Sequence, residues 1–108
     1  MSAIDWDRLN ELRSDIGEED FADVAILFVA ELQESLDGLD PATANVADFH
    51  FVRGSAANLG FTALVEACAS AETACQTGAA PDVEAVRRAF DDALAEVRPT
   101  VPELADAA

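Results

Sequence analysis

Basic residues are scarce in this sequence. Its 108 residues carry 22 acidic side chains and 6 basic ones, so the formal net charge is −16 at pH 7. Lysine is absent, and the basic residues, Arg8, Arg13, Arg53, Arg87, Arg88 and Arg98, form no continuous basic stripe. Such a surface repels nucleic-acid phosphates and anionic membrane surfaces. We therefore expect neither a nucleic acid nor a membrane as partner.

Long apolar runs are also missing. No segment of about 18 apolar residues predicts a membrane span, and the N-terminal stretch MSAIDWDRLNE lacks the basic and apolar regions of a signal peptide. We expect a cytoplasmic location. The two cysteines, Cys68 and Cys75, share one predicted helix, which separates their Cα atoms by about 10 Å. A disulfide tolerates no more than about 7 Å, so we expect both thiols to be reduced.

The two-residue alternation of half-buried strands is almost absent, whereas apolar residues recur at helical spacing. Cap and stop residues delimit five helices: between Asp5 and Gly17, from Glu18 to Gly38, from about Ala42 or Asn45 to Leu59, from roughly Thr62 to Thr77, and between Asp82 and Pro99. Hydrophobic residues make up 51% of the chain, enough for one core. We predict an all-α fold, an antiparallel up-down four-helix bundle with a short additional N-terminal helix, as a single domain over residues 1–108.

Two further expectations concern packing. The inward stripe of the second helix is predicted to be Phe21, Val24, Phe28, Leu32 and Leu36. Residues 98–108 contain Pro99 and Pro102, which end the last helix, and we expect these residues to form a flexible acidic tail. The domain is expected to be a monomer.

The single histidine lies in the stretch HFVRGSAANLG, residues 50–60. On a helix, the core stripe of this region is Phe49, Val52, Ala56 and Leu59. His50 lies roughly 140° from the centre of that stripe and is therefore predicted to face solvent. Its own sector holds Val46, Ala47, Arg53, Gly54 and Ala57.

Gly54 leaves the imidazole uncovered. A side chain at this position would lie against His50, because helical side chains lean over the preceding turn. Glycine inside a helix costs about 1 kcal/mol relative to alanine, which calls for a compensating advantage. Val46, Ala47 and Ala57 leave a shallow surface on which another protein could dock. Arg53, one turn after His50, supplies positive charge to an anion attached to the ring.

These features suit a histidine that accepts and donates a phosphoryl group. A neutral imidazole is a nucleophile near neutral pH, and phosphoryl transfer depends mainly on in-line access and charge stabilisation. The alternative is an ordinary surface histidine beside a glycine that serves tight helix packing.

At these residues the sequence resembles the histidine-containing phosphotransfer (HPt) domains, whose signature reads roughly H-x-L-K-G-S-[SA]-x-x-L-G. The resemblance continues at Leu64, Cys68 and Glu72 and covers nearly the whole chain. Val52 stands where the family has leucine, which is a core exchange. Arg53 replaces the usual lysine, which keeps the charge but changes the donor geometry.

The resemblance implies a phosphorelay intermediate and not an enzyme. His50 would accept a phosphoryl group from the aspartate of one receiver domain and pass it to another. The implied partners are receiver domains of response regulators or of a hybrid histidine kinase. No ATP site, metal site or cofactor is expected in this chain, because the receiver's acidic pocket would hold the Mg²⁺.

In many family members a side chain of the next helix bonds the active histidine, and the candidates here are Glu72 and Gln76. A carboxylate would repel an attached phosphoryl group, so we expect Glu72 to be a solvated edge residue.

The sequence also bears on two other classes of protein. A di-iron enzyme would need two Glu-x-x-His pairs, and one histidine cannot supply them. A non-catalytic acidic adaptor that binds a basic protein partner is the alternative function, since the large negative charge supports it.

Overall fold

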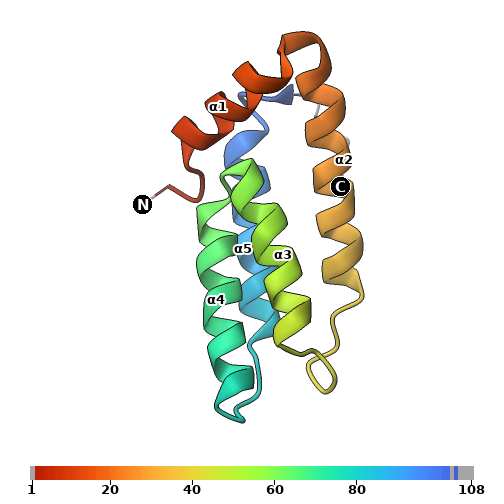
Figure 1. The fold of residues 1–108 in the computed structure, drawn as a ribbon, viewed down its shortest axis with the longest axis vertical. Coiled ribbons are helices and arrows are strands. Elements are labelled where there is room, and N and C mark those ends of the chain that lie inside the picture. Colours follow the sequence, from red (N-terminus) through yellow and green to blue (C-terminus); the bar gives the residue numbers. More distant parts are fainter. Residues whose placement is uncertain (1, 103, 105–108) are drawn as a thin grey trace.

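The computed structural model describes residues 2–102 and residue 104, and within these residues it is all helical with no strand. The helices are α1 (Trp6–Ile16), α2 (Glu18–Asp37), α3 (Val46–Leu59), α4 (Thr62–Gln76) and α5 (Val83–Val97). The predicted all-α fold is confirmed. In Figure 1, α2 to α5 run alternately down and up the long axis, and the shorter α1 crosses one end. No helix of the described residues is long and apolar enough to cross a membrane.

Side-chain caps fix where three of these helices begin. Asp5, Asn45 and Asp82 each accept a hydrogen bond from the backbone N–H three residues later, as N-cap residues do. Asn45 and Asp48 form a reciprocal capping box. Of the two starting points predicted for α3, Asn45 is therefore the one that the structure has.

Gly60 joins α3 to α4 in a conformation that a side chain would not tolerate. Its φ is +74°, and a Cβ at this position would lie 2.6 Å from the carbonyl oxygen of Asp5. The Gly60 carbonyl in turn accepts a hydrogen bond from the Asp5 N–H at 2.7 Å. The glycine thus ends α3 and lets the N-terminal segment pack against the α3–α4 turn.

The N-terminal segment is also held by α5. The Glu96 carboxylate accepts hydrogen bonds from the Ser2 hydroxyl, from the Ala3 N–H at 2.9 Å and from the Trp6 indole N–H at 3.2 Å. These bonds, with the Ser2 hydroxyl foremost, hold the pKa of Glu96 below its usual value. Two segments 90 residues apart in the chain are thereby joined.

The core stripe predicted for α3 is confirmed, since Phe49, Val52, Ala56 and Leu59 are all buried. In α2 the stripe is turned slightly from the prediction: the buried residues are Phe21, Ala25, Val29, Leu32 and Leu36. Val24 and Phe28 are only half-buried. Both sets have helical spacing, and the prediction favoured the larger side chains, whereas the direction of the Cα–Cβ bonds decides which residues face inward.

Two positions of the predicted flexible tail are packed into the core. Val101 and Leu104 are 2% and 1% exposed, and the Leu104 carbonyl accepts a hydrogen bond from Arg98 Nε at 3.3 Å. Val101 continues the apolar stripe of α5 one turn beyond Val97. The regular helix therefore ends before the prolines, but buried residues continue beyond it. The expectation of a flexible tail over 98–108 is wrong at Val101 and Leu104. Its remaining positions, 103 and 105–108, lie outside the described residues.

Candidate functional site

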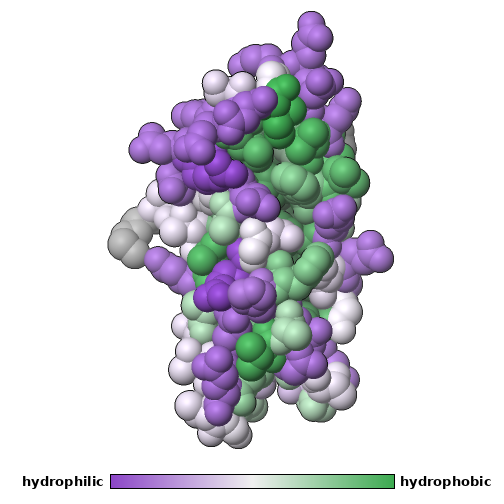
Figure 2. Space-filling model, in the orientation of Figure 1, coloured by the Kyte–Doolittle hydropathy of each residue, from purple (hydrophilic) through white to green (hydrophobic). Residues whose placement is uncertain are grey.

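The side chain of His50 is 69% exposed, as the helical spacing predicts. On the same helix, Ala47, Gly54 and Ala57 are exposed and Val46 is half-buried. Figure 2 shows the face on which α2 and α3 lie, with apolar side chains reaching the surface between hydrophilic ones. The structure thus places the predicted docking residues around an accessible imidazole.

Gly54 has no packing reason to be a glycine. A Cβ built on it would meet no heavy atom within 4 Å in the described part of the chain. Gly60, by contrast, is pressed against the backbone of Asp5. The interpretation of Gly54 as a contact point between helices is therefore wrong, and no packing contact of the described residues offsets its cost in helix stability.

Glu72 reaches His50 from α4. Its Oε1 lies 3.3 Å from Nδ1 of the imidazole, and its side chain is only 10% exposed. The prediction that Glu72 is a solvated edge residue is wrong, because α4 packs closely on α3 and Ala71 and Cys68, on the same face, are in the core. Gln76, the other candidate, is exposed at the end of α4, and its side chain makes no hydrogen bond within the described residues.

Arg53 completes a three-residue cluster. Its Nη2 lies 3.0 Å from Nδ1 of His50, and its Nε lies 3.0 Å from Oε2 of Glu72. The second contact is an ion pair by distance, but the N–H is not directed at the oxygen, and Oε2 receives no aligned hydrogen bond from the described residues. A buried carboxylate oxygen without a donor is costly, so this cluster is electrostatically paired but incompletely hydrogen-bonded.

The two ring nitrogens of His50 have different surroundings. Both Arg53 and Glu72 approach Nδ1, whereas no hydrogen bond from the described residues reaches Nε2. A neutral imidazole carries one proton, so one nitrogen donates and the other accepts. Only when the proton is on Nδ1 does Nε2 have a free lone pair, and in that state Nε2 is the nucleophilic atom.

Cys68 lies one turn before Glu72 and is fully buried. Burial foremost, and then the negative charge of Glu72, raises the pKa of its thiol to about 12, against a smaller lowering by Arg53. The thiol therefore stays protonated and has no nucleophilic role. Both cysteines are free, as predicted, although Cys75 is only half-buried.

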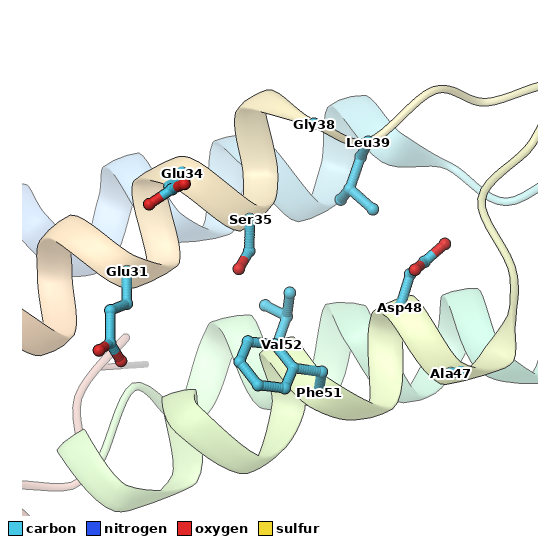
Figure 3. Close-up of a pocket in the computed structure, with 9 residues that line it drawn as sticks. All are labelled: Glu31, Glu34, Ser35, Gly38, Leu39, Ala47, Asp48, Phe51 and Val52. Carbon is cyan, nitrogen blue, oxygen red and sulfur yellow. The ribbon is translucent and has the colours of Figure 1, made fainter.

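A groove runs between α2 and α3 (Figure 3). It has a volume of about 590 Å³ and is lined by Glu31, Glu34, Ser35, Gly38, Leu39, Ala47, Asp48, Phe51 and Val52. Ser35 and Val52 point toward one another across it. Phe51 is 58% exposed, and the sequence interpretation missed it, although an aromatic residue on the outer face of a predicted helix is the signal that marks it.

Within the residues that the structure describes, no group of three or more histidine, cysteine, aspartate or glutamate side chains is placed to hold a metal ion.

The Hpt domain family model matches residues 19–100, and the chain belongs to this family. The match starts at the second residue of α2, extends beyond the end of α5 and includes the His50 motif. Hpt domains act in phosphotransfer within phosphorelays, are helical bundles, and interact with receiver domains. Neither the comparison with curated proteins nor that with solved structures gave a match.

Proposed function

We propose that this protein is a phosphorelay intermediate that accepts a phosphoryl group on His50 from a receiver-domain aspartate and passes it to another receiver. The observation that carries the proposal is the exposed ring of the only histidine, whose Nε2 receives no hydrogen bond from the described residues while a buried carboxylate approaches Nδ1. The antiparallel four-helix arrangement presents this ring on the wall of the bundle, away from the core.

The proposed transfer is a displacement at phosphorus. The Nε2 lone pair forms the N–P bond, while the P–O bond to the receiver's aspartate breaks and its electron pair stays on the departing carboxylate. Passing the group onward reverses these steps on a second receiver. Such a reaction needs access and charge stabilisation more than covalent chemistry from the protein.

Glu72 stabilises the charge that this step creates. When Nε2 binds phosphorus while Nδ1 keeps its proton, the ring becomes positive, and a carboxylate 3.3 Å from Nδ1 favours that form. Since Glu72 approaches the ring at Nδ1, its charge is remote from a phosphoryl group on Nε2. The repulsion expected from the sequence is reduced accordingly.

Arg53 and Gly54 act on the incoming group. Arg53 offers its guanidinium to the phosphoryl oxygens, for which charge-assisted hydrogen bonds are strong. Gly54 leaves open space beside the ring, so that the receiver's backbone can approach in line with Nε2.

The receiver docks on the surface around the ring. We assign to this surface Val46, Ala47 and Ala57 from the sequence and Phe51 from the structure. Its apolar centre and its small side chains suit a close protein contact. The Mg²⁺ of the reaction comes from the receiver, and the chain acts in the cytoplasm as a monomeric phosphocarrier without a cofactor or an ATP site of its own.

The experiment that tests the proposal is incubation with a radiolabelled, phosphorylated receiver domain. Label is expected on this chain in an acid-labile, base-stable form, as phosphohistidine requires, and it should be lost in His50→Gln. Persistent label in that variant, or no transfer from any receiver of a broad panel, would contradict the proposal. An acidic adaptor, in contrast, would bind a basic partner equally well in wild type and in His50→Gln, with a steep dependence on salt.

A further inference from the structure

We propose that Arg53 sets the resting tautomer of His50, holding Nδ1 as a hydrogen-bond acceptor and so keeping Nε2 protonated until a phosphoryl group draws the guanidinium away. This inference rests on the proposed function of His50. It makes Arg53 a positioning residue that acts on the ring before the reaction as well as on the phosphoryl group during it.

The argument starts from two contacts that exclude each other. Arg53 Nη2 lies 3.0 Å from Nδ1 of His50, and Glu72 Oε1 lies 3.3 Å from the same atom. A guanidinium only donates and a carboxylate only accepts. In a neutral ring Nδ1 therefore either accepts from Arg53 or donates to Glu72. The shorter contact, to Arg53, is the one that the resting geometry favours.

Each choice fixes the state of Nε2. When Nδ1 accepts from Arg53, the single ring proton is on Nε2, whose lone pair is then used and which cannot attack phosphorus. When Nδ1 donates to Glu72, Nε2 is unprotonated and nucleophilic. Exchange between the two states moves a proton from Nε2 to water and another from water to Nδ1, so no oxidant, reductant or further reactant is needed.

Glu72 favours the tautomer in which Nε2 can react. Its side chain is nine-tenths buried, and its Oε2 has no aligned donor among the described residues. While Arg53 occupies Nδ1, Oε1 has no ring proton to accept either. A buried carboxylate short of donors is unfavourable, so once the arginine leaves, Glu72 favours the tautomer whose Nδ1–H donates to Oε1.

A phosphoryl group provides the reason for the arginine to leave. Arg53 is 36% exposed and lies one turn from His50 on the same helix. A phosphoryl oxygen carries negative charge and accepts from a guanidinium more strongly than a neutral imidazole nitrogen does. The arrival of the donor thus converts Nε2 into a nucleophile, and an unoccupied site stays unreactive.

The test reads the tautomer directly. With a single histidine in the chain, ¹⁵N-labelled histidine gives one pair of ring-nitrogen signals, whose shifts report the proton position at a pH where the ring is neutral. Wild type is expected to be mainly Nε2–H. Arg53→Gln is expected to shift the ratio toward Nδ1–H by about tenfold, the size of losing one hydrogen bond to a charged group.

The matched control is Arg88→Gln, which removes the same charge from an exposed site on α5 and should leave the ratio unchanged. A wild-type ring that is already mainly Nδ1–H, or an Arg53→Gln ring with the wild-type ratio, would overturn the inference. Label transfer from a phosphorylated receiver to wild type is measured separately. If label is transferred but Arg53→Gln keeps the wild-type tautomer ratio, only the role of Arg53 is refuted. If no label is transferred, the proposed function is refuted, whatever the tautomer ratio is.

Discussion

The Glu72 carboxylate lies 3.3 Å from Nδ1 of His50, although 22 residues separate them in sequence and the glutamate is among the most buried charged groups described. The contact joins α4 to the exposed face of α3. We predict that Glu72→Gln slows phosphoryl transfer by about tenfold, because a neutral amide stabilises a positive ring less than a carboxylate does. Single-turnover transfer from a phosphorylated receiver measures this rate.

Glu66→Gln is the control for that variant, since Glu66 is an exposed residue of the same helix. It should transfer at the wild-type rate. Equal rates in all three proteins would show that the buried carboxylate has no part in the reaction.

Substitutions of Gly54 should separate its effect on the stability of the domain from its effect on access to the His50 ring. Gly54→Ala is expected to raise the free energy of unfolding by about 0.5–1 kcal/mol, because alanine favours the helix and its Cβ meets only open space. Gly54→Phe should fold but block transfer by covering the ring. Urea unfolding and the transfer assay check the two effects, and full transfer by Gly54→Phe would refute the steric argument.

Gly60 and Gly78 form a matched pair for the helix ends. Both have positive φ, +74° and +80°, but only a Cβ on Gly60 would collide, with the Asp5 carbonyl at 2.6 Å. Gly78→Ala should cost about 1 kcal/mol of unfolding free energy for the backbone conformation alone. Gly60→Ala should cost clearly more, about 2 kcal/mol or above. Thermal or urea unfolding measures both, and equal losses would mean that the Asp5 contact relaxes freely.

Phe51 is predicted to be a main contact with the receiver. Phe51→Ala should weaken receiver binding by about tenfold or more, as loss of an aromatic anchor does, while stability changes little because the ring is 58% exposed. Leu27→Ala is the control, since Leu27 is 56% exposed on α2 and does not line the groove. Titration calorimetry with an unphosphorylated receiver distinguishes them, and identical affinities would place the docking surface elsewhere.

The two thiols should differ in reactivity with pH. Burial raises the pKa of Cys68 to about 12, so its thiolate is scarce at pH 8. Iodoacetamide at that pH should modify the half-buried Cys75 and leave Cys68 until the protein unfolds. Mass spectrometry of digested protein before and after denaturation measures this order. Early modification of Cys68 in folded protein would contradict its burial.

The sequence predicted the helices well because their signals are local. Asp5, Asn45 and Asp82 are caps that act within one turn, and the outward position of His50 follows from helical spacing alone. Those features need no knowledge of how the helices pack.

The predictions from the sequence were wrong at positions whose burial depends on tertiary packing. The burial of Glu72 depends on how closely α4 approaches α3, and the burial of Val101 and Leu104 depends on how the segment after Pro99 packs against the core. The burial of these residues cannot be predicted from their neighbours in the sequence. The position of Phe51 was readable from the helix, but its meaning emerges only with the groove that α2 forms beside it.

The burial of residues before α2 and after α5 has a consequence for trimming this domain. The family match ends at residue 100 and starts at 19, yet Ile4, Leu9, Val101 and Leu104 are buried in the same core. A fragment cut to the matched residues would strip one end of the bundle and expose apolar side chains to water, at about 1.5–3 kcal/mol each. The cooperative folding unit therefore extends beyond the recognised motif on both sides, and shortened versions should melt earlier and aggregate.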